Sequence, residues 1–193
     1  MGSLKYCGMV GMLFIIVVCA GCRTGNPEFH MSEDVDFSTI KRVAVLPFEN
    51  FSSERNAEDM VRQLVITELL ASRLVDVTVP GEATAAIEKM GIKTPATLDA
   101  QQIKALGSAL KVQAVILGSV NRFGEARTGT VSAPEVSVTL MMAETNAGTV
   151  VWSITKSEGG ASFMARYFGA RTDTMSETAL KVVREALQTL SIQ

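Results

Sequence analysis

The segment Arg42–Phe48, which reads RVAVLPF, decides the fold class of this chain. It is short and nearly continuous in apolar residues, as is typical of a strand covered on both faces of a sheet. Pro47 has no amide hydrogen to donate to a neighbouring strand, so we expect the strand to end there. The globular part therefore opens with a buried strand of a sheet that carries helices on its faces.

Helical and strand patterns alternate after this strand. Asn56–Leu74 predicts a helix with Asn56 as its N-cap. Its expected apolar face consists of Met60, Leu64, Ala71 and Leu74, flanked by Val61 and Val65. Val75–Val79 predicts a second strand that ends at Pro80-Gly81. Two further helices are expected over Glu82–Met90 and over Asp99–Leu110, the latter capped by Thr97 or Asp99.

The second half of the chain is richer in strands. Val112–Phe123 is apolar and predicts a strand that is interrupted at Gly118 and Ser119. Apolar and polar residues alternate over Val136–Met142, which predicts a second strand. Val150–Ile154 predicts the strand that returns beside it, with Trp152 in the core. A last helix over Asp173–Leu190 opens with the capping-box spacing of Thr174 and Glu177. Gly124–Pro134 is expected as a long loop, either a contact arm or a passive connection.

The order of elements is therefore β-α-β-α-α-β-β-β-α. Strands that alternate with helices and then follow one another predict one mixed sheet of about five strands with helices packed on its faces. The fold class is α/β or α+β, depending on how the late strands pair.

The N-terminus carries a targeting signal. Lys5 precedes the apolar run Val10–Ala20, which at 11 residues is too short to span a bilayer and predicts a signal peptide over residues 1–21. Cys19-Ala20-Gly21-Cys22 resembles the lipobox of bacterial lipoproteins, which implies cleavage before Cys22 and acylation of that residue. An ordinary secretory signal with a chance cysteine is the alternative.

The cysteines agree with a lipid anchor. Cys7, Cys19 and Cys22 are the only three, so a mature chain that begins at Cys22 has no second thiol for a disulfide. Arg23 stands where lipoproteins retained at the inner membrane carry Asp, and this resemblance implies anchoring in the outer-membrane lipid. Residues 22–38 are expected to be the lipidated N-terminus and a flexible tether, followed by one periplasmic domain over residues 39–193.

Composition and motifs exclude several classes of function. A net charge of −2 and 6% aromatic residues disfavour nucleic acid as a partner. The only histidine, His30, lies in the expected tether, and no phosphate-binding glycine motif occurs, so no cofactor or metal is expected. Carboxylate pairs remain for a hydrolase, namely Glu58 with Asp59 and Glu125 with Glu135. The expectation is a protein that is not an enzyme.

One segment has the composition of a partner contact. Ala161–Arg171 groups aromatic rings with arginines, a combination typical of interface anchors. The candidate contact residues are Phe163, Arg166, Tyr167, Phe168 and Arg171. The alternative is that the rings cover the sheet or the last helix as a small satellite core.

Three stretches carry a resemblance to a known family. They are Val43–Asn50 (VAVLPFEN), Leu106-Gly107 followed by Ala114–Val120 (AVILGSV), and Thr145 followed by Gly148–Ser153 (GTVVWS). In this order they resemble the CsgG-like and TolB N-terminal-like group of bacterial envelope proteins, which includes LpoB and meningococcal-type surface lipoproteins. The resemblance implies a periplasmic domain with a mixed sheet that acts through protein contacts.

These observations lead to three hypotheses of different classes. The first is a non-enzymatic outer-membrane lipoprotein that scaffolds or assists envelope assembly or secretion, with a homo-oligomer left open. The second is an LpoB-like regulator that activates a peptidoglycan synthase by direct contact. The third is a periplasmic hydrolase, which predicts turnover that is lost when one carboxylate is replaced.

Overall fold

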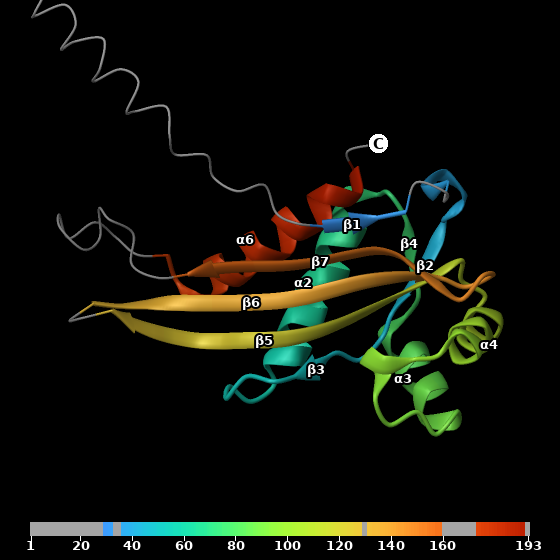
Figure 1. Cartoon of the computed structure of the whole chain (residues 1–193), viewed down its shortest axis with the longest axis horizontal. Coiled ribbons are helices and arrows are strands. Elements are labelled where there is room, and N and C mark those ends of the chain that lie inside the picture. The colour runs from blue at the N-terminus through green and yellow to red at the C-terminus, as the bar shows by residue number, and fades with distance from the viewer. Residues whose placement is uncertain (1–28, 33–35, 129–130, 160–172, 192–193) are drawn as a thin grey trace, which may run out of the picture.

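In the part of the chain that the structure describes, a mixed sheet carries two α-helices on each face (Figure 1). The computed structural model describes residues 29–32, 36–128, 131–159 and 173–191. Within these ranges the strand order is β1-β7-β6-β5-β2-β4, with β3 paired to β5. The strands are β1 (Phe29–Met31), β2 (Arg42–Val45), β3 (Glu49–Asn50), β4 (Asp76–Val77), β5 (Ala114–Thr128), β6 (Val131–Glu144) and β7 (Thr149–Gly159).

The expected mixed α+β fold is confirmed, with seven described strands in place of about five. The expected order of elements holds apart from β1 and β3, which are short strands added at the N-terminal side. β2 runs parallel to β4 and β5, whereas β5, β6 and β7 form an antiparallel meander. β2 also ends before Pro47, as expected.

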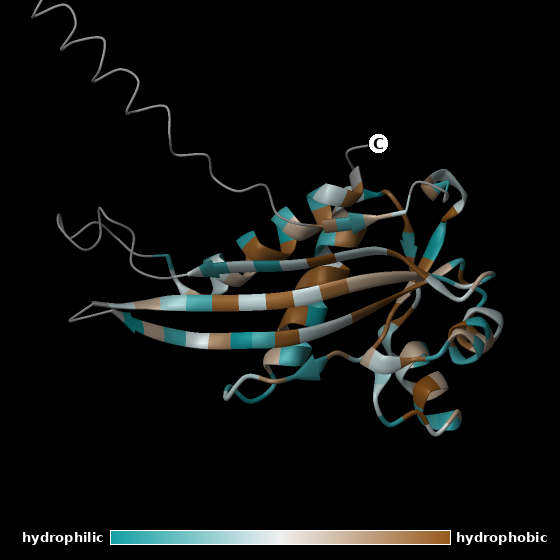
Figure 2. Cartoon of the chain, viewed as in Figure 1, coloured by the Kyte–Doolittle hydropathy of each residue, from teal (hydrophilic) through white to brown (hydrophobic). Residues whose placement is uncertain are grey.

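Two hydrophobic clusters cover the two faces of β2. Val43 and Val45 face helices α2 (Ala57–Ser72) and α6 (Met175–Gln188), and Ala44 and Leu46 face α3 (Pro80–Lys89) and α4 (Ala100–Leu110). All four of these side chains are fully buried. The long strands differ from β2, because apolar and polar residues alternate along them (Figure 2).

The apolar face expected for the first helix is correct in Leu64 and the flanking Val61 and Val65, which face the core, but wrong in Met60, Ala71 and Leu74, which are exposed. α2 buries Val61, Val65 and Leu69, which recur every four residues and form one stripe against the sheet. Met60 and Leu74 are exposed because they fall outside this stripe. Asn56 stands at the N-cap position but makes no side-chain capping hydrogen bond, since its backbone adopts the left-handed conformation with φ of 60°.

The boundary before α3 also differs from the expectation. The helix begins at Pro80 itself, two residues earlier than expected, and only Asp76–Val77 pair as a strand. The fixed φ of proline suits the first helical position. An amide hydrogen at that position has no acceptor within the helix, so its absence in proline costs no hydrogen bond. Gly91, with φ of 66°, follows the end of this helix as expected.

The expected loop Gly124–Pro134 is wrong, because β5 and β6 continue through it as one antiparallel hairpin. Their pairing runs from Ala114 opposite Glu144 to Thr128 opposite Val131, with one bulge after Val120. Gly118 and Ser119 do not interrupt β5 either. Gly118 leaves room for the ring of Phe48, which lies 2.8 Å from where a Cβ would stand.

The expected tether contains ordered structure. Phe29–Met31 pair with Ile154–Trp152 of β7, and Phe37–Thr39 form a short 3-10 helix with Asp36 as its cap. His30 therefore lies on an edge strand opposite Ser153. The sequence hides this strand because three residues are too few for a periodic pattern.

The caps of the later helices and the core position of Trp152 are confirmed. Asp99, one of the two expected caps of α4, forms a capping box with Gln102, and Thr174 forms one with Glu177 at α6. Trp152 is fully buried, and its indole N–H donates to Thr189 Oγ1 at 3.0 Å. The last helix, Met175–Gln188, buries Ala179, Val182, Val183 and Ala186.

Replacing Gly107 by alanine is expected to lower the free energy of unfolding by about 1–3 kcal/mol. A Cβ at Gly107 of α4 would lie 2.3 Å from Cβ of Thr145, whose hydroxyl already donates to Val112 O at 2.8 Å. Gly81→Ala in α3 is the matched control, because nothing lies within 4 Å of its added Cβ. Denaturant unfolding measures both variants, and equal stability of the two would contradict this packing.

Candidate interaction surfaces

The residues predicted to anchor the chain or to contact a partner lie outside the described residues. They are Cys22, Phe163, Arg166, Tyr167, Phe168 and Arg171. The lipidation and contact roles of these residues therefore stay predictions. The described residues carry surfaces of their own, which the following paragraphs build from the helices and strands that hold them.

The acidic residues considered for a hydrolase do not form a facing pair. Glu135 lies opposite Gly124, so the next residue, Glu125, points to the other face of the hairpin. Arg122 binds Glu135 at 2.6 Å, and Ser132 donates to Glu125 at 2.7 Å. These carboxylates each serve a local contact within the hairpin.

Glu58, at the start of α2, also serves a local contact. Its carboxylate accepts a hydrogen bond of 2.6 Å from the side-chain amide of Asn50. Across the part of the chain that the structure describes, no three or more His, Cys, Asp or Glu side chains gather as a metal site. None of the helices described there has the length and apolar character needed to cross a bilayer.

An apolar hollow lies where α2 and α6 end. Two adjoining cavities of about 410 and 370 Å³ share Leu69, Leu74 and Leu190. We call this surface the α2–α6 hollow, and its apolar lining also includes Phe37, Ile40 and Val75. Leu74 of the lining is 52% exposed, so the hollow opens to solvent along an apolar side chain. Such a surface suits an apolar anchor of a partner.

Charged residues border the hollow. Arg184 of α6 donates two hydrogen bonds of 3.0 Å to the carboxylate of Glu68 of α2, and this pairing raises the pKa of Arg184. Asp36 and Lys41 lie on the other border. Hydrogen bonds from the side chain and backbone of Ser38 lower the pKa of Asp36. The hollow thus carries both signs of charge around an apolar floor.

The sheet face opposite α2 and α6 is polar beyond the reach of α3 and α4. The hydrophobic cluster under those helices ends at Leu117 of β5 and Met141 of β6. Farther along the hairpin, the side chains on this face bind one another. Asn121 donates to Thr139 at 2.8 Å, and the hydroxyls of Ser137 and Ser157 lie 2.7 Å apart. Because these groups satisfy one another, the face is hydrophilic without a strong charge.

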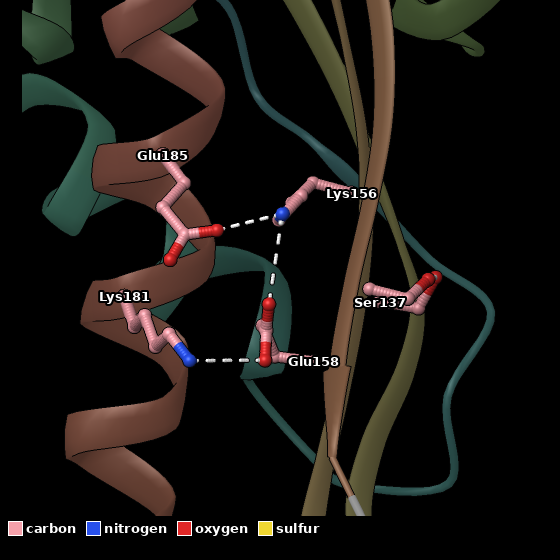
Figure 3. A network of polar contacts seen from close by, with 6 residues as sticks. Ser137, Lys156, Glu158, Lys181 and Glu185 are labelled. Carbon is pink, nitrogen blue, oxygen red and sulfur yellow. Dashed lines mark hydrogen bonds and ion pairs between the residues drawn. The ribbon is translucent and has the colours of Figure 1, made fainter. Parts of the chain in front are cut away.

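A network of charged residues ties β7 to α6 (Figure 3). Lys156 of β7 binds Glu185 of α6 at 2.6 Å and Glu158 at 3.5 Å, and Glu158 also binds Lys181 at 3.2 Å. The hydrogen bond to Glu185 raises the pKa of Lys156 despite the opposing effect of burial. The Lys156 side chain is only 18% exposed, so the network is a structural connection.

The variant Lys156→Gln is expected to be less stable than the native protein by about 1 kcal/mol at neutral pH. A lysine with a raised folded-state pKa stabilises the fold below its unfolded pKa, and this contribution is lost as the pH rises through the folded pKa. The difference between the two proteins should therefore shrink above about pH 10.5. Denaturant unfolding at neutral and alkaline pH tests this, and a difference that grows with pH would contradict the network.

Arg62 fastens α2 to the carboxyl end of β2 and to α3. Its guanidinium donates to the backbone oxygen of Val45 at 2.8 Å and to that of Pro80 at 3.2 Å. Burial lowers the pKa of Arg62, and Asp59 partly offsets this effect. With these hydrogen bonds to backbone oxygens and a further one to the Thr84 hydroxyl, Arg62 holds these elements together.

The comparisons with known proteins find likeness in structure. No protein-family model matches the chain, and the curated proteins hold no match to its sequence. A PelC variant from Paraburkholderia phytofirmans, solved as a dodecamer, aligns with a TM-score of 0.59 at 20% identity over 86% of this chain and 98% of its own. A second PelC dodecamer gives 0.56 at 18% identity over 84% and 96%.

The lipoprotein GNA1162 from Neisseria meningitidis has the same fold. It aligns with a TM-score of 0.55 at 15% identity, over 79% of this chain and 99% of its own. The comparisons do not support the narrower CsgG-like and TolB-like names that the sequence suggests.

Sequence reasoning missed the α2–α6 hollow and the exposed Phe51. Leu69 lies in the last turn of α2 and Leu74 lies beyond the end of that helix, so a helical pattern does not bring these two lining residues together. At the level of the fold, this chain is similar to PelC and to lipoprotein GNA1162.

Proposed function

We propose that this chain is a non-enzymatic lipoprotein of the outer membrane that faces the periplasm and assists envelope assembly or secretion as an oligomer of identical copies. The observation that carries the proposal is the fold shared with PelC and GNA1162 over 98% and 99% of those chains. PelC was solved as a dodecamer and GNA1162 is a lipoprotein. The lipobox-like end at Cys22 supplies the anchor.

The short distance between the anchor and the fold supports a position close to the membrane. Six residues, 23–28, separate Cys22 from β1, and they span at most about 22 Å when fully extended. A domain held this closely works at the membrane surface and does not reach far into the periplasm. This favours an assembly or secretion role over the LpoB-like regulation of a peptidoglycan synthase.

The described surfaces favour contact over catalysis. The acidic residues Glu58, Glu125 and Glu135 each take part in a local hydrogen bond or ion pair. The α2–α6 hollow has an apolar floor and charged borders, an arrangement that is typical of protein interfaces. A protein with this surface acts by binding its neighbours.

Photocrosslinking in cells tests the proposal. A photoreactive residue is placed at Leu74 in the lining of the hollow, at Ser157 on the polar face, or at Glu88 on α3, with Cys22 kept. Crosslinks to further copies and to envelope assembly or secretion proteins would support the proposal. A peptidoglycan synthase as the dominant partner would instead identify a regulator, and turnover of glycan or ester substrates by the purified protein would identify a hydrolase.

A further inference from the structure

An exposed phenylalanine stands at the opposite end of α2 from the hollow. Phe51 follows β3 and is 66% exposed, the largest exposed fraction among the described large hydrophobic side chains. It precedes the first residue of α2, whereas Leu69 and Leu74 of the hollow lie at and beyond the last turn. The 16 residues of α2 span about 24 Å.

The backbone around Phe51 is held rigidly. The Phe51 N–H donates to Val120 O at 2.9 Å, and the Ser52 N–H and hydroxyl donate to Asn50 Oδ1 at 2.9 and 2.7 Å. Asn50 in turn donates to Glu54 O and to the Glu58 carboxylate. An exposed aromatic ring on a braced loop loses little freedom on binding, which favours its use as an anchor.

We propose that Phe51 of one copy inserts into the α2–α6 hollow of the next copy. The inference rests on the self-assembly proposed above and names its interface. The hollow has the volume of a small-ligand pocket, which accommodates one aromatic side chain. Because ring and hollow lie at opposite ends of α2, they meet between molecules, head to tail.

Charges agree with this pairing. Glu54 and Arg55 are exposed beside Phe51, and Asp36 and Lys41 border the hollow, so each surface offers one charge of each sign to the other. One buried ring contributes only part of the roughly 800 Å² that each partner buries in a stable interface. The neighbouring loop and helix ends supply the remainder. A head-to-tail contact of this kind closes into a ring when the rotation between copies allows it.

Two variants and their mixture test the contact in the full chain purified from membranes in detergent. Phe51→Ser removes the ring and Leu74→Glu places a charge in the hollow, and both positions are exposed, so the melting temperature should stay close to native. Each variant alone is expected to be monomeric in mass photometry. An equimolar mixture should form 1:1 pairs, because the ring of the Leu74→Glu copy still fits the intact hollow of the Phe51→Ser copy.

The matched control is Phe29→Ser, which removes another exposed phenylalanine, 41% exposed on β1, and should keep the native assembly size. Variants that keep the native size, or a mixture that stays monomeric, would overturn the contact while leaving self-assembly intact. A native protein that is itself monomeric would overturn both. If the chain's own terminus fills the hollow, the Leu74→Glu variant should have a lower melting temperature and an unchanged assembly size. That result would also overturn the contact.

Discussion

Trp152→Ala is expected to lower the free energy of unfolding by about 3–5 kcal/mol. The indole is fully buried in the cluster between the sheet and helices α2 and α6. Its removal leaves a large cavity and also leaves the Thr189 hydroxyl without the indole donor that now lies 3.0 Å away. Chemical denaturation followed by circular dichroism measures the loss.

Two further variants separate packing from hydrogen bonding at this position. Thr189→Val keeps the ring but leaves the indole N–H unpaired in the core, for an expected cost of about 1–3 kcal/mol. Val150→Ala, at an exposed position of the same strand, should change stability by less than about 0.5 kcal/mol. If Trp152→Ala were no less stable than Val150→Ala, the core assigned to β7 would be wrong.

Cys22→Ser is expected to move most of the protein from the membrane fraction to the soluble periplasmic fraction. Each buried methylene of an acyl chain contributes about 0.8 kcal/mol, so several chains on one residue hold a protein durably where a single chain is marginal. Serine at this position cannot carry the thioether-linked lipid. Fractionation of cells followed by immunoblotting measures the distribution.

Cys19→Ser is the matched control for the anchor. It changes a thiol three residues earlier in the same lipobox-like stretch, and the protein should stay with the membrane. Should Cys22→Ser sediment with membranes as the native protein does, the anchor is not at Cys22. The periplasmic location close to the membrane would then lose its support.

Local signals in the sequence predict much of the fold. The first four residues of the apolar run RVAVLPF form β2, which is buried on both faces and ends before Pro47. The spacing of Thr174 and Glu177 is the capping box of α6. In these cases a few adjacent residues determine the local structure, so no knowledge of distant contacts is required.

Errors arose where distant partners decide the local structure. β5 continues past Gly118 because Phe48, 70 residues earlier, fills the space, and past Gly124 because β6 supplies its hydrogen bonds. α2 buries Val61 and not Met60 because the sheet and α6 determine which stripe faces inward. The α2–α6 hollow combines residues from both ends of the chain, and a linear pattern does not reveal such a surface.

Native mass spectrometry of the protein extracted from membranes in detergent tests the central claim most directly. It reports the mass of each chain and the number of chains in the particle together. We predict a complex of several identical chains, each beginning at Cys22 and carrying the mass of its acyl groups. A chain without lipid, or a particle that contains one chain at every concentration, would contradict a lipid-anchored protein that works as an assembly.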